Sequence, residues 1–337
     1  MKRHGNLYSK ITSIDNISQA YLNARKGKKW QDTIQNFEKN LEDNLLAIQK
    51  SLIDKTFTTS KYRTKIITIP KKREIFILPF APDRIIQHAL MNVIELIWDN
   101  LFIYDSYACR KGKGIHKGSQ RTMRAVRNNK YCLKMDISKF YPSINHDILF
   151  SIVQRKIKCP DTLRLIKDII YSVGGGQNVP IGNYTSQWLG NLYMNEIDQF
   201  LKHEHKVKYY IRYCDDFCVY NDDKKYLHEL KNIIENFLEI KLKLKFSKAD
   251  VFPVKQGVDF LGYRHFPNYI LLRKSTAKRV KKRLIRMPKM LRLGLINKEQ
   301  FRSSIASTWG WLKWANTYNF RLKHKLEELM QYSNNIN

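Results

Sequence analysis

The chain has 337 residues and a formal net charge of +31, from 61 Lys and Arg against 30 Asp and Glu. A hydrophobic share of 43% with 12% aromatic residues excludes a disordered chain, and the length allows two or three lobes. The charge excess predicts a polyanionic partner, most commonly nucleic acid, with an anionic membrane surface as the competing candidate.

The N-terminal third combines helical and strand-like patterns. Apolar residues recur at helical spacing over residues 30–52, which predicts one amphipathic helix. Two β-prone runs at 64–69 and 74–80 flank the basic segment 70–73, so we expect a hairpin whose tip either binds a ligand or is a solvated turn. A helix is expected over 82–101, beginning at a Pro-Asp-Arg sequence.

A basic loop and a buried strand follow. The loop at 110–118 alternates glycine with Lys and Arg; it could hold phosphates but matches no nucleotide-binding fingerprint. The run 131–137 predicts a buried strand that carries Asp136 near its end. Phe140 and Tyr141 come directly after this strand, where they could press against a bound substrate.

A turn region, a helix and a segment with two adjacent aspartates follow the buried strand. A glycine-rich turn region at 174–182 precedes a helical pattern at 185–200. The segment 209–220 then consists of two β-prone runs around Asp215 and Asp216. Aspartate is a poor strand residue but a good turn residue, so the pair is expected at a hairpin tip. An ordinary solvated turn is the competing interpretation.

The following segments complete an α+β pattern. We expect a helix at 226–238 and strands at 240–246 and 258–263. The order of these elements fits a sheet backed by helices.

The C-terminal part is strongly basic. Residues 273–292 contain ten Lys or Arg and no acid, while one helical face stays apolar. An ordinary solvated helix mixes both signs of charge, so contact with phosphates is the preferred interpretation. From Ser307 onward the pattern is helical, and its tryptophans are expected in the core of a small helical lobe.

Three aspartates therefore have related settings. Asp136 ends a buried strand, and Asp215 with Asp216 occupies a hairpin tip. On neighbouring strands, three such carboxylates could hold two Mg²⁺ ions about 4 Å apart. Two such ions would activate an attacking hydroxyl and neutralise a departing pyrophosphate, which is the chemistry of nucleotidyl transfer. The expected cofactor is Mg²⁺, with Mn²⁺ as a substitute.

These motifs resemble those of reverse transcriptases. Tyr213–Asp216 resembles the YxDD box, and Met135–Asp136 with Phe140–Ile144 resembles the first palm aspartate motif. Further similar blocks lie in the family's order over residues 60–290: 73–87, 106–110, 180–198 and 260–263. The resemblance implies an α+β, right-hand polymerase fold with fingers, an antiparallel palm sheet backed by helices, and a helical thumb.

The resemblance also implies the roles of individual residues. Asp136, Asp215 and Asp216 would be catalytic metal ligands, together with the backbone carbonyl of Ile137. Six residues would contact the incoming nucleotide: Arg73, Lys71, Tyr141, Phe140, Ile181 and Gln187. Tyr141 would exclude a 2′-hydroxyl, unless it is a core aromatic residue. Phe260, Leu261 and Gly262 would form the primer grip. Nucleic acid would bind at Arg110, Lys111, Lys113, Lys274, Lys278, Arg279, Lys282 and Arg286.

One block indicates a subtype. Residues 180–187 read Pro-Ile-Gly-Asn-Tyr-Thr-Ser-Gln, where most reverse transcriptases have glutamine second and proline last. The pattern IGxxxSQ is similar to that of reverse transcriptases from diversity-generating retroelements, which make frequent errors opposite template adenine. An aliphatic Ile181 cannot hydrogen-bond the incoming nucleotide, so discrimination should loosen. This substitution does not explain why adenine is affected.

The resemblance predicts a domain plan and partners. The plan is an N-terminal helical segment (1–58), fingers with part of the palm (59–130), palm (131–264, with a fingers/palm turn region at 170–190) and basic helical thumb (265–337). Expected partners are template RNA, cDNA, deoxynucleotides and a small basic pentameric accessory protein. With no long apolar run and no signal peptide, we expect a cytoplasmic bacterial or phage-encoded protein without a membrane partner.

Other functions are also compatible with the sequence. Retron, group II-like and phage-defence reverse transcriptases share the chemistry but differ in template and outcome. A catalytically silent RNA-binding protein would keep the basic surface, but it would not need three aspartates.

Overall fold

The structure is a computed structural model and describes residues 3–68 and 71–335. The chain forms two compact units. The first consists of Met1–Cys109, Asp136–Val207 and Asn232–Lys248, and the second of Arg110–Met135, Lys208–Lys231 and Ala249–Asn337. Each unit combines helices with antiparallel strands, which confirms the predicted α+β class.

The first unit is mainly helical. Helix α2 packs on α5, and α10 packs on α5 and α8. The buried faces of these helices supply a large part of this unit's core, because their apolar residues recur at helical spacing. Its helices and helical turns are α1 (Tyr8–Ile11), α2 (Ile14–Arg25), α3 (Asp32–Glu38), α4 (Leu41–Ile53), η1 (Phe80–Arg84), α5 (Ile85–Asp99), α7 (Phe140–Ser143), α8 (His146–Gln154), α9 (Pro160–Tyr171), α10 (Tyr184–Gln199) and η2 (Phe200–Glu204).

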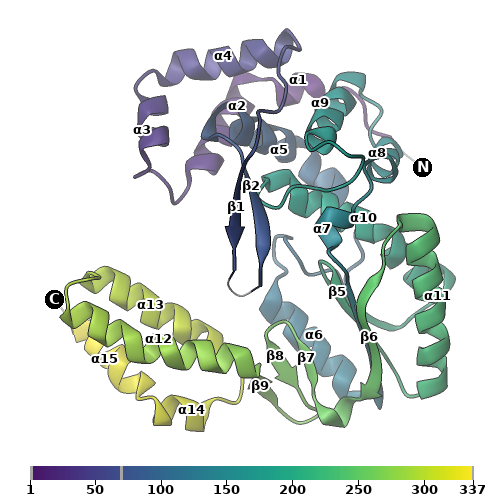
Figure 1. The fold of residues 1–337 in the computed structure, drawn as a ribbon, viewed down its shortest axis with the longest axis vertical. Coiled ribbons are helices and arrows are strands. Elements are labelled where there is room, and N and C mark those ends of the chain that lie inside the picture. The colour runs from purple at the N-terminus through teal and green to yellow at the C-terminus, as the bar shows by residue number, and fades with distance from the viewer. Residues whose placement is uncertain (1–2, 69–70, 336–337) are drawn as a thin grey trace. The chain divides into compact units, whose positions relative to one another are not determined.

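A two-stranded hairpin extends from these helices (Figure 1). Strand β1 (Arg63–Ile67) pairs with β2 (Arg73–Ile77), with Arg63 opposite Ile77 and Ile67 opposite Arg73. The predicted hairpin is confirmed. Ile69 and Pro70 of its tip lie outside the described residues, and Lys71 and Lys72 are exposed.

One helix prediction in this unit was wrong in extent. The expected helix at 30–52 is two helices, α3 and α4, separated at Lys39 and Asn40. Asn40 has φ −127° and ψ 53°, outside the helical region. The asparagine side chain can hydrogen-bond nearby backbone groups in non-helical conformations, which favours a break in the helix here. Because the spacing of apolar residues continues across this break, the sequence pattern did not show it. The helices expected at 82–101 and 185–200 are present as η1 with α5, and as α10.

The second unit contains most of a four-stranded sheet in the order β4-β5-β3-β6. A smaller sheet has the order β7-β8-β9, and α6 (Ile115–Arg127) packs against β4 and β8. The strands are β3 (Tyr131–Ile137), β4 (Tyr209–Tyr213), β5 (Asp216–Asn221), β6 (Phe246–Pro253), β7 (Val258–Phe260), β8 (Tyr263–His265) and β9 (Ile270–Leu272). The boundary between the units falls within β3 and β6.

Two strand predictions needed correction. The expected strand at 240–246 was wrong, because α11 (Lys224–Leu242) continues through its first three residues and β6 begins only at Phe246. Leu238 and Leu242 are both 1% exposed, so the buried face of α11 extends to the last residue of the helix. The expected strand at 258–263 is divided between β7 and β8 by a turn at Leu261 and Gly262, both with positive φ.

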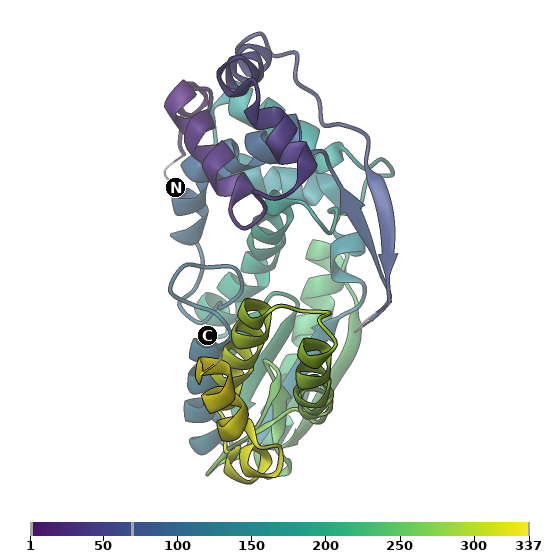
Figure 2. The same cartoon turned by 90° about the vertical axis from the view of Figure 1, so that its left-hand side faces the viewer.

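The C-terminal helices form a small lobe of the second unit, seen in Figures 1 and 2. These are α12 (Lys274–Arg292), α13 (Lys298–Leu312), α14 (Tyr318–Lys323) and α15 (Leu326–Asn335). Six buried apolar side chains make its core: Val280, Leu284, Phe301, Ile305, Leu312 and Leu326. Trp309 packs against this core, as predicted. Trp311 instead stacks on Tyr263 of β8, at 5.2 Å between ring centroids.

Candidate active site

The Asp-Asp hairpin is present in the second unit. Tyr213 pairs with Asp216 at the end of the β4–β5 ladder, so Cys214 and Asp215 form a two-residue turn. Cys214 has φ +59°, as such turns require at one or both central positions. Asp215 thus lies in the turn and Asp216 begins β5, and both side chains are half-buried.

A buried arginine supports this turn. Arg212 is fully buried, and its Nη1 donates a hydrogen bond to the carbonyl oxygen of Cys214 (3.0 Å). A charged group is buried at this depth only when it is paired or hydrogen-bonded. The role of Arg212 was not predicted; the signal in the sequence is one arginine among the apolar residues of β4.

A lysine of β3 contacts the second aspartate. Lys134 Nζ lies 3.4 Å from Asp216 Oδ2 and donates a hydrogen bond to the backbone oxygen of Asp259 (2.6 Å). Burial by itself would lower the pKa of Lys134, but Asp216 and other negative neighbours outweigh burial and raise that pKa. Lys134 therefore connects the aspartate hairpin to the segment beside Phe260. It was also not predicted.

Asp136 belongs to the first unit and has its own partner. Ser247 Oγ donates to Asp136 Oδ2 (2.7 Å) and lies 3.2 Å from the Asp136 backbone oxygen. This contact orients the carboxylate. Ser247 was missed because 111 residues separate it from Asp136 in the sequence. Ile137, the last residue of β3, is buried.

Three of the predicted nucleotide contacts line one hollow of about 330 Å³ in the first unit. They are Tyr141, Ile181 and Gln187. The Tyr141 ring packs over Gly190 of α10, where an added Cβ would come within 3.1 Å of it. Phe140 is buried beside Tyr141 and does not line the hollow, so it supports the position of the Tyr141 ring.

The loop that carries Ile181 is fixed by backbone contacts. The amide of Phe76 in β2 donates to the Ile181 carbonyl oxygen (2.8 Å). Gly182 has φ +133°, and a Cβ there would overlap the carbonyl oxygen of Phe76. Ser186 Oγ donates to the Pro180 carbonyl oxygen (2.6 Å). The glycine and the serine of the IGxxxSQ pattern therefore have structural roles.

Gln87 of α5 is a further support that was not predicted as a site residue. Its buried Oε1 accepts a hydrogen bond from the Tyr184 amide (3.0 Å) at the start of α10. The first amides of a helix lack intrahelical partners, so this contact satisfies one of them.

Three further residues with basic side chains that line the hollow were also missed. Lys28, Arg84 and His88 line it together with the nucleotide-contact candidates. Burial, and then the charge of Arg84, lower the pKa of Lys28. Burial, and then the charges of Lys28 and Arg84, lower the pKa of His88 to about 4, and its ring stacks on Tyr184 at 4.0 Å.

The remaining nucleotide and nucleic-acid candidates lie elsewhere. Arg73 and Lys71 are exposed at the β1–β2 hairpin and do not line the hollow. The loop with Arg110, Lys111 and Lys113 precedes α6. The five thumb candidates are exposed on α12: Lys274, Lys278, Arg279, Lys282 and Arg286.

The predicted primer grip lies in the small sheet. Phe260 is buried at the end of β7, and Leu261 and Gly262 form the turn to β8. The Trp311 ring packs against Gly262, where an added Cβ would come within 3.1 Å of it. This turn is therefore held by the C-terminal helices of the same unit.

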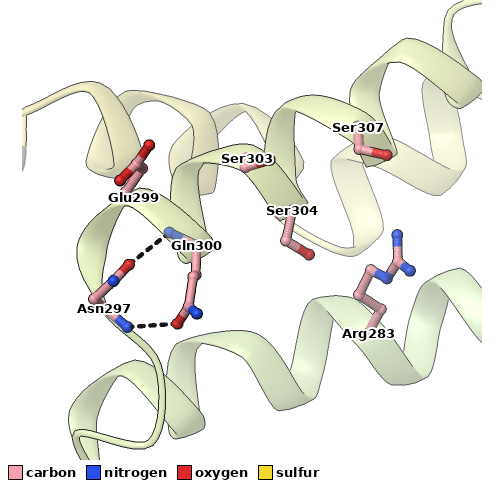
Figure 3. A pocket seen from close by; sticks show the side chains of 7 residues that line it. All are labelled: Arg283, Asn297, Glu299, Gln300, Ser303, Ser304 and Ser307. Atoms are coloured by element: carbon pink, nitrogen blue, oxygen red, sulfur yellow. Dashed lines mark hydrogen bonds between the residues drawn. The ribbon is translucent and has the colours of Figure 1, made fainter. Parts of the chain in front are cut away.

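A second hollow, of about 600 Å³, lies between α12 and α13 (Figure 3). Arg283 extends into it from α12, opposite Ser304 and Ser307. Asn297 and Gln300 form a capping box at the start of α13, so their side-chain oxygens are engaged in capping the helix N-terminus. Glu299 also lines the hollow, which makes it less suited to phosphate than the acid-free faces of α12.

Two kinds of feature are absent from the part of the chain that the structure describes. Within residues 3–68 and 71–335, no three His, Cys, Asp or Glu side chains form a metal-binding group. In the same part of the chain, no helix has both the length and the apolarity to cross a bilayer. Mg²⁺ is commonly held by one or two carboxylates together with substrate phosphates, so adjacent Asp215 and Asp216 fit that ion.

Comparisons with known proteins agree with the motifs. Residues 69–265 match the family described as reverse transcriptase (RNA-dependent DNA polymerase). Protein YkfC of Escherichia coli (strain K12) is 24% identical over 273 residues, which is 65% of this chain and 71% of that protein. Group II intron-encoded protein LtrA of Lactococcus lactis subsp. cremoris is 26% identical over 212 residues, or 58% of this chain and 35% of LtrA.

A third relative is a fungal protein. The uncharacterized 91 kDa protein in the cob intron of Schizosaccharomyces pombe is 26% identical over 131 residues. The match covers 36% of this chain and 16% of that protein. The chain therefore spans most of YkfC but only a minor part of the two longer relatives.

Proposed function

The chain belongs to the reverse transcriptase (RNA-dependent DNA polymerase) family of enzymes, and from that premise we propose that it copies a template RNA into error-prone cDNA. The observation that carries the proposal is the two-residue turn that places Asp215 and Asp216 side by side, within the part of the chain that matches the family. Such a turn presents two hard oxygen ligands on a rigid support.

The proposed reaction is attack of a primer 3′-hydroxyl on the α-phosphorus of a deoxynucleotide, with departure of pyrophosphate. Asp136, Asp215, Asp216 and the Ile137 carbonyl are the proposed ligands for two Mg²⁺ ions, with Mn²⁺ as a substitute. Bound metal would acidify the 3′-hydroxyl and neutralise the pyrophosphate. Support comes from the sheet order, in which β3 neighbours β5, and from the contacts that orient Asp136 and Asp216.

The chain's other residues would bind and select the substrates. Exposed Arg73 and Lys71 would contact the triphosphate, and Tyr141 would pack against the sugar and disfavour a 2′-hydroxyl. The close packing of Tyr141 on Gly190 supports this role, because a ring held in place is an effective steric gate. The basic face of α12 and the loop at Arg110 would hold the template–primer duplex.

We assign the enzyme to the diversity-generating retroelement type. Ile181 and Gln187 of the IGxxxSQ pattern both line the hollow that also contains Tyr141, which supports a direct influence of this pattern on nucleotide selection. By the same resemblance, a small basic pentameric accessory protein would share the template RNA. Template-primed synthesis by the isolated chain, at full processivity, would contradict the need for that partner.

A group II-like enzyme is the second candidate. The relative LtrA is named as encoded by a group II intron, and another relative is named for its place in the cob intron. The two candidates differ in their errors: frequent misincorporation opposite template adenine favours the retroelement type, and uniformly accurate copying favours the group II-like type.

The test of polymerase function is primer extension on an RNA template with Mg²⁺ and deoxynucleotides. Asp215→Asn should reduce the rate by at least about a hundredfold, because a lost metal ligand removes several kcal/mol of transition-state stabilisation. Asp43→Asn, at an acidic residue in the first turn of α4, is the control and should leave the rate unchanged. Undiminished extension by Asp215→Asn would contradict the mechanism.

A further inference from the structure

Four residues of the second unit are joined by a continuous series of ion pairs and hydrogen bonds. The series begins at Asp216 of the aspartate hairpin, whose Oδ2 lies 3.4 Å from Lys134 Nζ on β3. The same ammonium group donates to the backbone oxygen of Asp259 on β7 (2.6 Å). The Asp259 carboxylate in turn accepts a hydrogen bond from Arg273 Nε. We name these four residues the Lys134 network.

The network ends at two elements that are predicted to hold nucleic acid. Arg273 immediately precedes α12, and its backbone amide donates to the Gly262 carbonyl oxygen (3.1 Å). Gly262 and Leu261 form the turn that was predicted as the primer grip, and α12 carries predicted phosphate contacts such as Lys274. Arg273 therefore holds the start of the basic helix beside this turn, and the network connects both to Asp216.

Lys134 is held on several sides. Besides its two oxygen partners, its ammonium group lies over the Phe260 ring, 5.9 Å from the ring centroid. An ammonium group has three N–H donors, and here it meets a carboxylate, a backbone oxygen and a ring face. The Lys134 side chain is only 21% exposed, and partly buried charges are screened by salt less than exposed ones. Lys134 is therefore suited to hold Asp216 and the end of β7 at a fixed separation.

The second link is more exposed. The Arg273 and Asp259 side chains are 35% and 50% exposed, and ion pairs at such positions contribute little to the unfolding free energy. The pair nevertheless restricts the start of α12, because Arg273 contacts β7 through its side chain and the following turn through its backbone amide. Its place between β7 and α12 therefore favours a role in orientation over one in stability.

We propose that the Lys134 network sets the position of the primer terminus relative to the aspartate hairpin, with Lys134, Asp259 and Arg273 as positioning residues. The inference rests on the proposed function, because it takes the duplex to lie on α12 and the turn at Gly262. Phosphate contacts by themselves allow a protein to slide along a duplex. A connected path from those contacts to Asp216 would favour the register in which the primer 3′-hydroxyl lies beside the aspartates.

The test breaks each link and measures affinity, register and rate separately. Lys134→Met removes the first link, and Asp259→Asn weakens the second while the backbone oxygen of Asp259 remains. The matched controls are Lys325→Met and Glu328→Gln, at an exposed ion pair of α15 (3.2 Å). Fluorescence anisotropy measures affinity for an RNA template–DNA primer duplex. Hydroxyl-radical footprinting without Mg²⁺ or deoxynucleotides locates the boundary of the bound enzyme, and single-turnover extension with Mg²⁺ gives the rate.

Each variant should bind the duplex within about twofold of the controls, because the phosphate contacts of α12 remain. The footprint boundary should spread over several nucleotides, and the single-turnover rate should fall roughly tenfold or more, since small misplacements of reacting groups are costly. Combining Lys134→Met with Asp259→Asn should be no worse than the more impaired single variant, because links in one network are not additive. Asp259→Arg with Arg273→Asp reverses the ion pair and should restore most of the rate and the sharp boundary.

Three results would overturn the proposal. They are a loss of duplex affinity with a sharp boundary, additive losses in the combined variant, and an unchanged boundary in both single variants. If Lys134→Met prevents folding, Asp259→Asn and the reversed pair, which alter exposed side chains, decide the inference by the same measurements. Because footprinting needs no catalysis, a wild-type chain that extends no primer would contradict the proposed function, while the footprint boundary would still decide this inference.

Discussion

The backbone amide of Phe76 donates a hydrogen bond to the carbonyl oxygen of Ile181, at 2.8 Å. Strand β2, which begins at Arg73, is thereby joined to the loop that lines the hollow containing Tyr141 and Ile181. Two of the proposed nucleotide-binding segments thus have a fixed relative position within the first unit. This relationship depends on Gly182, the residue next to Ile181.

Gly182→Ala should destabilise the first unit by more than about 1 kcal/mol, because alanine disfavours φ +133° and its Cβ would overlap the Phe76 carbonyl oxygen. Gly174→Ala is the control, since a Cβ there has no atom within 4 Å and no positive φ to strain it. Denaturant unfolding measures both. Equal stability of the two variants would contradict the described packing of β2 on this loop.

Ser247→Ala should lower kcat roughly tenfold and increase the Mg²⁺ concentration needed for half-maximal rate. The hydrogen bond from Ser247 Oγ to Asp136 Oδ2 orients a proposed metal ligand, and bonds to charged groups contribute about 1.5–3 kcal/mol. A Mg²⁺ titration of primer extension measures the effect. Ser151→Ala, which removes an exposed hydroxyl from α8, should behave as wild type. The same Mg²⁺ dependence in both variants would exclude this positioning role.

The unfolding free energy should fall as the pH is lowered from about 6.5 to about 4. Burial lowers the pKa of His265 from 6.5 to about 4, so in this window the unfolded chain binds a proton that the folded chain does not. The neutral ring is held between the Ser119 hydroxyl at Nε2 (2.7 Å) and the Val258 carbonyl at Nδ1 (3.2 Å). The difference corresponds to on the order of 3 kcal/mol at most.

His265→Gln should remove part of this pH dependence, as measured by denaturant unfolding at several pH values. Below about pH 4 both states are protonated, so no further loss from this residue is expected. His228→Gln replaces an exposed histidine of α11 and is the control. An unchanged pH profile in His265→Gln would indicate that other groups, such as His88, account for the dependence.

Ile181→Asn should reduce misincorporation opposite template adenine. An amide in the proposed nucleotide site beside Tyr141 can hydrogen-bond a correctly placed nucleotide, and each 1.4 kcal/mol of regained preference reduces errors about tenfold. Sequencing of cDNA made on one RNA template measures the error rate. Ile181→Val keeps an aliphatic side chain and should retain the wild-type rate. An unchanged error rate in an active Ile181→Asn enzyme would assign Ile181 to packing alone.

Local sequence determined the elements that carry the proposed catalytic and nucleic-acid-binding residues. The Asp-Asp hairpin, the strand with Asp136 and the basic helix α12 follow from turn preference, apolar runs and charge pattern, all of which act over a few residues. Packing decided one boundary that the local pattern predicted wrongly. Helix α11 continues to Leu242 because that side chain is buried on the same face of the helix as Leu238.

The tertiary structure alone decided which distant side chains meet. Ser247 binds Asp136 across 111 residues of sequence, and Lys134 contacts Asp216 between separate strands. Arg84 and Lys28 gather beside Ile181 because an N-terminal loop, η1 and the start of α10 line one hollow. Residue type and spacing determine the conformational preference of a short segment. Contacts between distant residues depend instead on how helices and strands pack their apolar faces together. A single sequence carries no local signal for such contacts.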